Sequence, residues 1–400
     1  MLLSIALIFI LSLSFGWVLS KLRLPALIGM IFTGMILGPY CLDLISPGIL
    51  NISAELRKIA LIIILIRAGL SLNIKELREN GMNIILMSFM PALFEVISYA
   101  LFAGYFFGFS IIESILLGSV IAAVSPAVIV PRMLKLKSEG WGVKQKVPQT
   151  LIASTSVDDV FVIVIFTVFL GLVQNADTGQ VSTSAADILK TVVSIPVSLI
   201  SGIVVGGIGG YLFNIYFKKF HIRDTIKVLI ILSIAMLMIV VEDVLKNIFD
   251  YSSLISIMTL GITLNYYYPV LTERLSFKFQ KLWIAAEIIL FVLVGAIMDV
   301  KYVGIVGWNV VFMLAIGVAF RMAGVYLSLL GSSMTNKEKL FCMIAFTPKA
   351  TVQAAIGSIA LSAGLPCGVV ILSVAVISIL LTAPLGAMTI DMIYKKLLRQ

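Results

Sequence analysis

The chain has 400 residues, of which 60% are hydrophobic and 12% charged, and its formal net charge at pH 7 is +9. Soluble globular domains carry about 25% charged residues, so this composition excludes a soluble protein and indicates a polytopic membrane protein without a soluble domain. One histidine and three cysteines, which match no metal-ligand spacing, argue against a histidine-based metal centre or proton relay.

Windows of about 20 apolar residues predict about thirteen membrane-spanning helices, and therefore an all-α fold. The first apolar run lacks the basic start and the small-residue cleavage site of a signal peptide, so we expect it to be a retained span. The predicted helices begin near Leu2, Pro25, Ala54, Met82, Ile111, Pro148, Ala186, Thr225, Ser253, Leu275, Val303, Lys339 and Gly368.

Lysines and arginines gather in alternate loops between these predicted spans. By the positive-inside rule that face of the cell membrane is cytoplasmic. This places the N-terminus outside the cell and the C-terminus in the cytoplasm. The same bias explains the net charge without a nucleic-acid partner. The basic loops hold Lys21 and Arg23, Lys75 and Arg78, Arg132 to Lys146, Lys218 to Lys227, Arg274 to Lys281, Lys337 and Lys339, and Lys395 to Arg399.

Two predicted spans carry a charged residue of opposite sign near their middle: Glu95 in the fourth helix and Arg321 in the eleventh. Each lies one helix before a proline-containing helix, so a pseudo-twofold relation would bring them together. An acid and a base inside the membrane are expected to form a buried ion pair. The alternative is that each faces a water-filled funnel separately.

The fifth and twelfth predicted helices each contain a hydroxyl residue before a mid-span proline, Ser125-Pro126 and Thr347-Pro348. Their positions differ by seven spans, so they cross the membrane in opposite directions, as inverted-topology repeats require. A mid-helix proline frees a carbonyl group, which is tolerated in lipid only where the break is buried or lines a polar cavity. The matched pair predicts a midplane ion site, although either proline alone would be an ordinary kink. Lys349 is expected to balance charge at the second break.

The sixth predicted helix contains two adjacent aspartates, Asp158 and Asp159. Carboxylates near the bilayer centre are costly and neighbours repel, so the pair indicates a function. Thr155 lies four residues before Asp159 and shares its helix face, whereas Asp158 is turned by about 100°. Such oxygen ligands suit a hard monovalent cation such as Na⁺ or Li⁺. The alternative is that both aspartates cap the positive ends of the broken helices.

Two further features concern the remaining helices. Gly202, Gly206 and Gly210 of the seventh helix form a small-residue stripe, which lets another helix approach closely. We expect packing within the subunit, with a dimer seam as the alternative. Glu287 of the tenth helix either extends towards the membrane interface or lines a funnel, and its role stays open.

Taken together, these motifs resemble those of the monovalent cation/proton antiporters, most closely the NHA-type branch with paired aspartates. The resemblance spans essentially the whole chain and rests on Arg67 to Leu70, Glu95, Val124 to Pro131, Ser154 to Asp159, Arg321, and Thr347 to Gly357. It implies two inverted repeats with crossed discontinuous helices, a homodimer, and a core that moves like an elevator against a dimerisation part. The core would comprise residues of about 82–173 and 303–395, and the dimerisation part residues of about 1–72 and 186–299.

By residue match, the resemblance makes Asp159 the principal ion and proton carrier, with Asp158 beside it and Thr155 as a helper ligand. Arg321 stands where many bacterial members with paired aspartates have a lysine that has been proposed to release a proton. Arginine stays protonated at physiological pH. The animal NHA-type proteins resemble this chain in having an arginine there and a glutamate placed like Glu95. With Arg321 held by Glu95, we expect Asp158 to be released from pairing with that helix.

The sequence therefore predicts a secondary active antiporter, working by alternating access, in which Na⁺ or Li⁺ competes with H⁺ for one carboxylate site. Because arginine offers no releasable proton, we expect one-for-one electroneutral exchange, a role in pH homeostasis, and no cofactor. The alternatives are K⁺/H⁺ antiport in the same family, Na⁺-coupled organic-anion symport on a related fold, and a sensor with dispensable aspartates. No nucleophile and base pair stands out, so no enzymatic activity is predicted.

Overall fold

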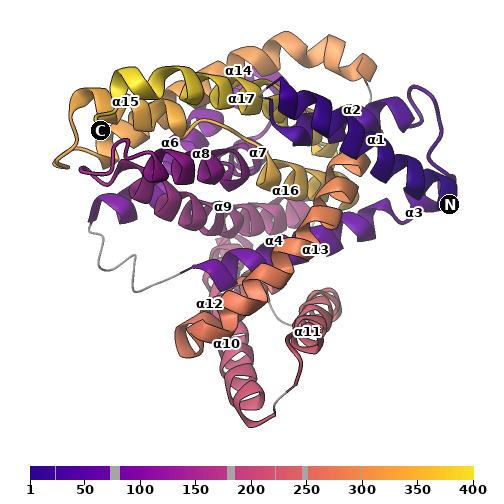
Figure 1. The fold of residues 1–400 in the computed structure, drawn as a ribbon. Helices are drawn as coiled ribbons and strands as arrows, with labels where there is room; N and C mark the ends of the chain where they lie inside the picture. Colours follow the sequence, from indigo (N-terminus) through magenta and orange to yellow (C-terminus); the bar gives the residue numbers. More distant parts are fainter. Residues whose placement is uncertain (23, 73–81, 178–184, 221, 246–250, 299) are drawn as a thin grey trace. The chain divides into compact units, whose positions relative to one another are not determined.

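The computed structural model describes residues 1–22, 24–72, 82–177, 185–220, 222–245, 251–298 and 300–400 (Figure 1). The predicted basic-loop residues Arg23, Lys75 and Arg78 lie outside these ranges. Within the described ranges every regular element is an α-helix, in agreement with the predicted fold class.

The helices follow one another with short connections. Nine helical segments in the described part of the chain are long and apolar enough to cross a membrane, and α2 and α16 are shorter apolar helices. The bounds are α1 (Leu2–Lys21), α2 (Ala26–Leu37), α3 (Pro47–Asn51), α4 (Ser53–Ser71), α6 (Met82–Phe107), α7 (Ile111–Ile121), α8 (Pro126–Ser138), α9 (Val147–Asp177), α10 (Ala185–Lys219), α11 (Asp224–Leu245), α12 (Ser253–Tyr267), α13 (Pro269–Ala296), α14 (Val300–Ser328), α15 (Asn336–Ala345), α16 (Thr351–Ser362) and α17 (Gly368–Leu397).

One predicted helix start differs clearly from the structure. The tenth helix was expected to begin near Leu275, but α13 begins at Pro269. Proline is favoured in the first turn of a helix because its fixed φ suits that position and its missing N–H would be unpaired there anyway. The hydropathy window missed this turn because Glu273 and Arg274 are charged, yet both side chains are exposed and so do not oppose the helix.

The fifth and twelfth predicted helices, which carry Ser125-Pro126 and Thr347-Pro348, begin in the same way, at α7 and at α15. Before α7, the Ser110 hydroxyl accepts the backbone N–H of Glu113, whose carboxylate accepts the backbone N–H of Ser110. Before α15, Thr335 and Glu338 form the same reciprocal arrangement. Such capping boxes satisfy backbone donors that a helix leaves unpaired at its start. Their recurrence supports the prediction that the two segments are related repeats.

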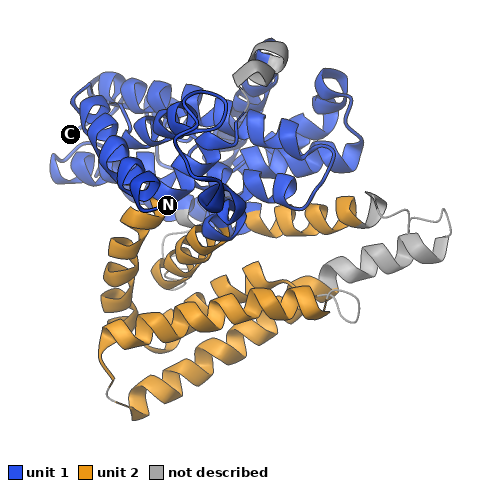
Figure 2. Cartoon of the chain, turned by 90° about the vertical axis from the view of Figure 1, so that its right-hand side faces the viewer, with its two compact units in different colours: residues 1–57, 77–162, 288–400 blue, residues 58–76, 163–287 orange. Residues whose placement is uncertain are grey.

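The chain divides into two compact units (Figure 2). The first comprises residues 1–57, 77–162 and 288–400, and the second residues 58–76 and 163–287. These boundaries differ from the predicted division into core and dimerisation parts. That division describes which parts move relative to each other, and it stays a prediction. All of the predicted site residues belong to the first unit.

The first unit contains two apolar clusters that hold its helices together. One joins residues of α6, α8, α9, α14, α15 and α17, with Leu151 and Phe341 fully buried. The other joins α1, α2, α3 and α13. Close packing of these side chains stabilises the contacts between the helices, and the first cluster includes Val124 and Phe346 at the two helix breaks.

In the second unit, the glycine stripe of α10 packs against the backbone of α12. A Cβ atom added at Gly202 would lie 2.8 Å from the carbonyl oxygen of Ser252, and one at Gly206 would collide with the carbonyl oxygen of Ser256. Gly210 meets the next turn of α12 in the same way. The expectation that this stripe serves packing within the subunit is confirmed.

We predict that Gly206→Ala lowers the free energy of unfolding by about 1–3 kcal/mol, because the new methyl group overpacks the contact with α12. The matched control is Gly207→Ala, whose methyl group would meet nothing nearer than the Thr263 hydroxyl at 3.9 Å. The control should be neutral or stabilising, since alanine favours helix over glycine. Thermal unfolding in detergent measures both, and equal melting temperatures would contradict the assigned contact.

Candidate functional site

The fifth and twelfth predicted helices are both interrupted at their Ser/Thr-Pro motifs, and the two interruptions touch each other. Residues 122–125 separate α7 from α8, and residues 346–350 separate α15 from α16. The Ser125 backbone N–H donates to the Pro348 carbonyl oxygen at 2.9 Å. The first unit therefore brings together the two Ser/Thr-Pro motifs that lie more than 200 residues apart in sequence.

Gln353 makes a second connection between the interruptions. Its side-chain amide donates to the carbonyl oxygens of Ile121 and Ala123 at 3.1 and 2.6 Å, and its Oε1 accepts the Ala350 N–H at 2.8 Å. The sequence alone did not indicate a role for this residue. The available signal was its place three residues into the helix after the break, where glutamine often accepts a free backbone N–H.

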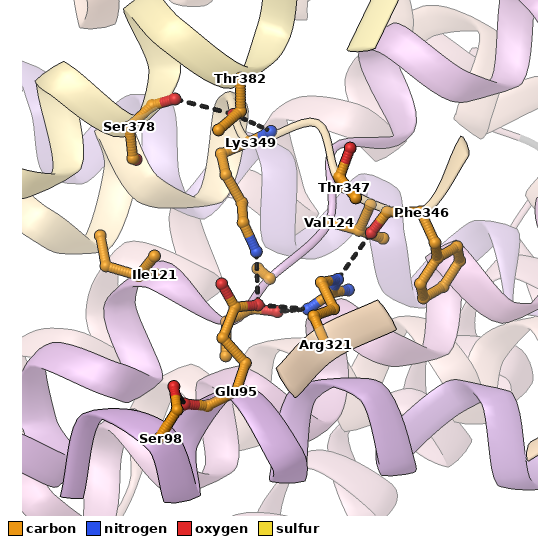
Figure 3. A network of polar contacts seen from close by, with 12 residues as sticks. Glu95, Ser98, Ile121, Val124, Arg321, Phe346, Thr347, Lys349, Ser378 and Thr382 are labelled. Carbon is orange, nitrogen blue, oxygen red and sulfur yellow. Dashed lines mark hydrogen bonds and ion pairs between the residues drawn. The ribbon is translucent and has the colours of Figure 1, made fainter. Parts of the chain in front are cut away.

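Arg321 of α14 is the centre of the polar network at this crossing (Figure 3). Its guanidinium is fully buried and donates to Glu95 Oε2 at 2.9 Å and to Asp158 Oδ2 at 3.1 Å. It also donates to the Phe346 carbonyl at 2.6 Å and to the Ala122 carbonyl. Those carbonyls lie at the ends of α15 and α7, where the helix dipole is negative, so one cation compensates both helix ends and two carboxylates.

Asp158 was expected to be released from pairing with α14, and this expectation is wrong. Besides Arg321, its carboxylate accepts the Val124 backbone N–H at 2.8 Å, just before α8 begins. The expectation assumed that Glu95 would occupy the arginine alone. A guanidinium has five donors on a planar fork and can therefore reach two carboxylates from different helices at once.

Lys349 has a partner that the sequence did not indicate. Its Nζ lies 2.5 Å from Glu95 Oε2, and its backbone N–H donates to the Thr382 hydroxyl of α17 at 2.9 Å. We expected Lys349 to balance charge at the second break. In the structure the Lys349 ammonium instead contacts the Glu95 carboxylate of α6. A carboxylate is a stronger partner for a buried cation than carbonyl dipoles are.

Glu95, Asp158, Arg321 and Lys349 form a cluster, called here the buried charge cluster, in which every side chain is fully buried. It contains two carboxylates and two cations, so it is neutral when all four groups are charged. Burying a single unpaired charge costs several kcal/mol, and pairing offsets much of this penalty. The cluster is thus a stable unit only while its charges balance.

The other predicted ion ligands lie on α9 beside this cluster. Asp159 retains 6% of its surface exposed, whereas Thr155 is fully buried and its hydroxyl donates to the Ile152 carbonyl at 2.9 Å. Ser125 Oγ is buried at the first break without a hydrogen-bond partner among the described residues. Within the part of the chain that the structure describes, no three His, Cys, Asp or Glu side chains gather in a resident metal site.

Glu287, whose role the sequence left open, lies in the second unit. Its side chain is half-buried, bonds with the Trp283 side chain, and lies within electrostatic range of Arg67. Arg67 in turn lies 5.8 Å from the centre of the Trp283 ring. These contacts hold Glu287 against α4 within its own unit.

Apolar helices of membrane-spanning length, two touching interrupted helices and a fully buried charge cluster define a class of protein. They are the features of multi-pass membrane transporters built from discontinuous helices. Polar groups of this cost persist in membranes where they mark an ion path or a substrate path.

The chain belongs to the sodium/hydrogen exchanger family, because the family described as "Sodium/hydrogen exchanger, transmembrane" matches residues 5–396. It is 31% identical over 413 residues to sodium/hydrogen exchanger 9B2 of Xenopus tropicalis, covering 96% of this chain and 72% of that protein. Human sodium/hydrogen exchanger 9B2 is 31% identical over 396 residues, covering 94% and 70% respectively. The predicted membership of the monovalent cation/proton antiporter superfamily is confirmed.

The fold agrees with a solved structure. The sodium proton antiporter MjNhaP1 from Methanocaldococcus jannaschii at pH 8 superposes with a TM-score of 0.81 at 21% sequence identity, covering 98% of this chain and 97% of that one. This likeness confirms the predicted Na⁺/H⁺ antiporter fold. The protein is therefore an antiporter of the Na⁺/H⁺ exchanger type and a multi-pass membrane protein.

We predict that the buried charge cluster behaves non-additively in a double-mutant cycle. Glu95→Ala leaves one surplus cation and Arg321→Ala one surplus carboxylate, so each should destabilise by about 3–5 kcal/mol. The double variant leaves Lys349 and Asp158, whose charges cancel, and should cost clearly less than the sum. Melting temperatures in detergent measure all three, and simple additivity would show that the pair is not coupled.

Proposed function

We propose that the protein exchanges Na⁺ or Li⁺ for H⁺ at one carboxylate site centred on Asp159. The observation that carries this proposal is the unequal surroundings of the two neighbouring aspartates. Asp158 is fully buried and engaged by Arg321 and the Val124 N–H, whereas Asp159, also buried, keeps 6% of its surface exposed. A group that must take up and release both a proton and a cation needs access to water, and Asp159 meets that need better.

The oxygens for the cation would come from the same face of α9 and from the first break. Thr155 lies one turn before Asp159, and Ser125 offers a buried hydroxyl without a partner among the described residues. Carboxylate, hydroxyl and carbonyl oxygens are suitable ligands for a hard cation. In this proposal Asp158 lies beside the site and keeps its orientation through Arg321.

Obligatory exchange follows from the cost of moving charge through lipid. Asp159 is neutral with a proton and its charge is compensated with Na⁺ bound, while the empty carboxylate would be negatively charged. The loaded forms therefore cross between the two membrane faces and the empty form does not. This is alternating access with competition at one site.

We further propose that residues of about 82–173 and 303–395 move as one core against a dimerisation part, in a homodimer. The buried charge cluster supports this, because its four residues and both breaks come from those two ranges. A network that depends on balanced charges favours motion as a rigid body. The N-terminus would lie outside and the C-terminus in the cytoplasm of the cell membrane.

Electroneutral exchange is the stoichiometry that the cluster supports best. If its two carboxylates and two cations keep their charges through the cycle, the cluster crosses the membrane with no net charge. Only Asp159 then changes its occupant, taking one Na⁺ in one direction and one H⁺ in the other. One-for-one exchange moves no net charge across the membrane.

We predict that Asp159→Asn abolishes Na⁺-driven proton flux in everted vesicles while the folded protein stays in the membrane, because the amide neither binds a proton nor carries a charge. Asp158→Asn, as the neighbouring control, should lower the melting temperature, since it leaves the cluster with a surplus cation. Wild-type exchange by the Asp159→Asn variant would refute the assignment.

We predict that the exchange rate in proteoliposomes responds little to a membrane potential clamped with valinomycin. Arg321→Lys introduces a group that can release a proton, and should shift the exchange towards voltage sensitivity. Lys349→Arg, which keeps a permanent charge near Glu95, should leave the exchange insensitive to voltage. A steep dependence of the wild-type rate on potential would instead require more than one proton per cycle.

A further inference from the structure

A cavity of about 630 Å³ in the first unit lies apart from the buried charge cluster and is rich in cations. Its walls include Arg132 and Lys135 of α8 and Lys395 of α17, with Asp391 as the one acidic side chain among the lining residues. Three cations and one carboxylate leave a net charge of +2. A hollow with this surplus is suited to hold an anion.

The arginine in this cavity is held in place while its charge is only partly compensated. Arg132 Nε lies 3.4 Å from Asp391 Oδ2, and Nη1 donates to the Val128 carbonyl at 3.0 Å. The Arg132 side chain is 20% exposed, so its guanidinium is accessible from the cavity. Guanidinium groups bind phosphate oxygens through parallel hydrogen bonds, and lysines add compact charge beside them.

An aromatic side chain completes the wall of the cavity. Tyr394 lines it and packs edge-on against Trp141, with 5.6 Å between ring centres. This contact limits the movement of the tyrosine ring. Its phenol group is a hydrogen-bond donor, which a phosphate oxygen can accept.

The cavity also borders α1, an apolar helix long enough to span a membrane, with exposed apolar side chains. Ser20, at the end of α1, lines it, and the same end of α1 exposes Trp17 at 61% and Val18 at 47%. Lys21 lies 3.7 Å from the centre of the Trp17 ring. Tryptophan and lysine at a helix end mark the membrane interface, where lipid headgroups lie. An anion bound at the membrane interface, beside an apolar helix face, is best explained as the headgroup of a phospholipid.

We propose that this cavity binds the phosphate group of an acidic phospholipid, whose acyl chains lie along the exposed face of α1. Basic pockets between membrane helices are suited to acidic headgroups. In such a pocket, the general attraction between basic residues and anionic lipid is concentrated on one bound headgroup. The site would join α1, α8 and α17. The proposal concerns lipid recognition and does not depend on which cation is exchanged.

The test uses the full chain, purified in detergent and stripped of lipid. Phosphatidylglycerol should raise its melting temperature, while phosphatidylcholine with the same acyl chains and inorganic phosphate at equal concentration should not. The Lys135→Gln, Lys395→Gln double variant should bind phosphatidylglycerol roughly twenty-five-fold more weakly, since each cation near the surface contributes about five-fold. Asp391→Asn should strengthen binding, because it removes the competing carboxylate.

The matched control is the Lys137→Gln, Lys396→Gln double variant. It removes the same charge from the same two helices, at exposed residues outside the cavity lining, and should bind like wild type. Melting temperatures without lipid show whether each variant is folded. Equal weakening in both double variants would mean a diffuse surface effect and overturn the site. Stabilisation by inorganic phosphate equal to that by phosphatidylglycerol would overturn the lipid as the ligand.

Discussion

The structure of the first unit depends on the burial of one guanidinium group. Arg321 compensates the negative ends of two interrupted helices and two carboxylates at the same point. Without it, unwound backbone and buried acids would meet in an apolar interior, where each unpaired group costs free energy. Glu95 and Lys349 then restore the charge balance. The crossing of the breaks is therefore as much an electrostatic arrangement as a packing arrangement.

This balance separates two roles that the paired aspartates could have shared. A carboxylate engaged by arginine and by a backbone N–H is suited to hold the crossing together. Its neighbour, turned by about 100° on the same helix, faces different surroundings and keeps some exposure. Adjacent positions on one helix thus place two acids in different surroundings at nearly the same depth.

Small residues and hydroxyl groups also hold the helices together, without the free-energy cost of burying charged groups. In the second unit, α10 approaches the backbone of α12 through glycines, which a lipid environment favours because it supplies no hydrophobic force between helices. In the first unit, capping boxes begin both interrupted helices and Gln353 bridges their breaks. Backbone groups that the interruptions release are thereby paired inside the protein, which a membrane requires.

The sequence by itself determined the class of the protein, most of its helical segments, the two helix breaks and the charged residues that lie inside membrane spans. Each of these depends on local composition: apolar length for a span, proline for a break, and the cost of a charge among apolar neighbours. Only the tertiary structure decided the partners. Helical periodicity places Asp158 and Asp159 on different faces, but it does not say which face meets Arg321. That choice, the contact of Lys349 with Glu95 and the bridge made by Gln353 join residues far apart in the chain. They arise because buried charges and freed backbone groups must find partners, and packing settles which ones come within reach.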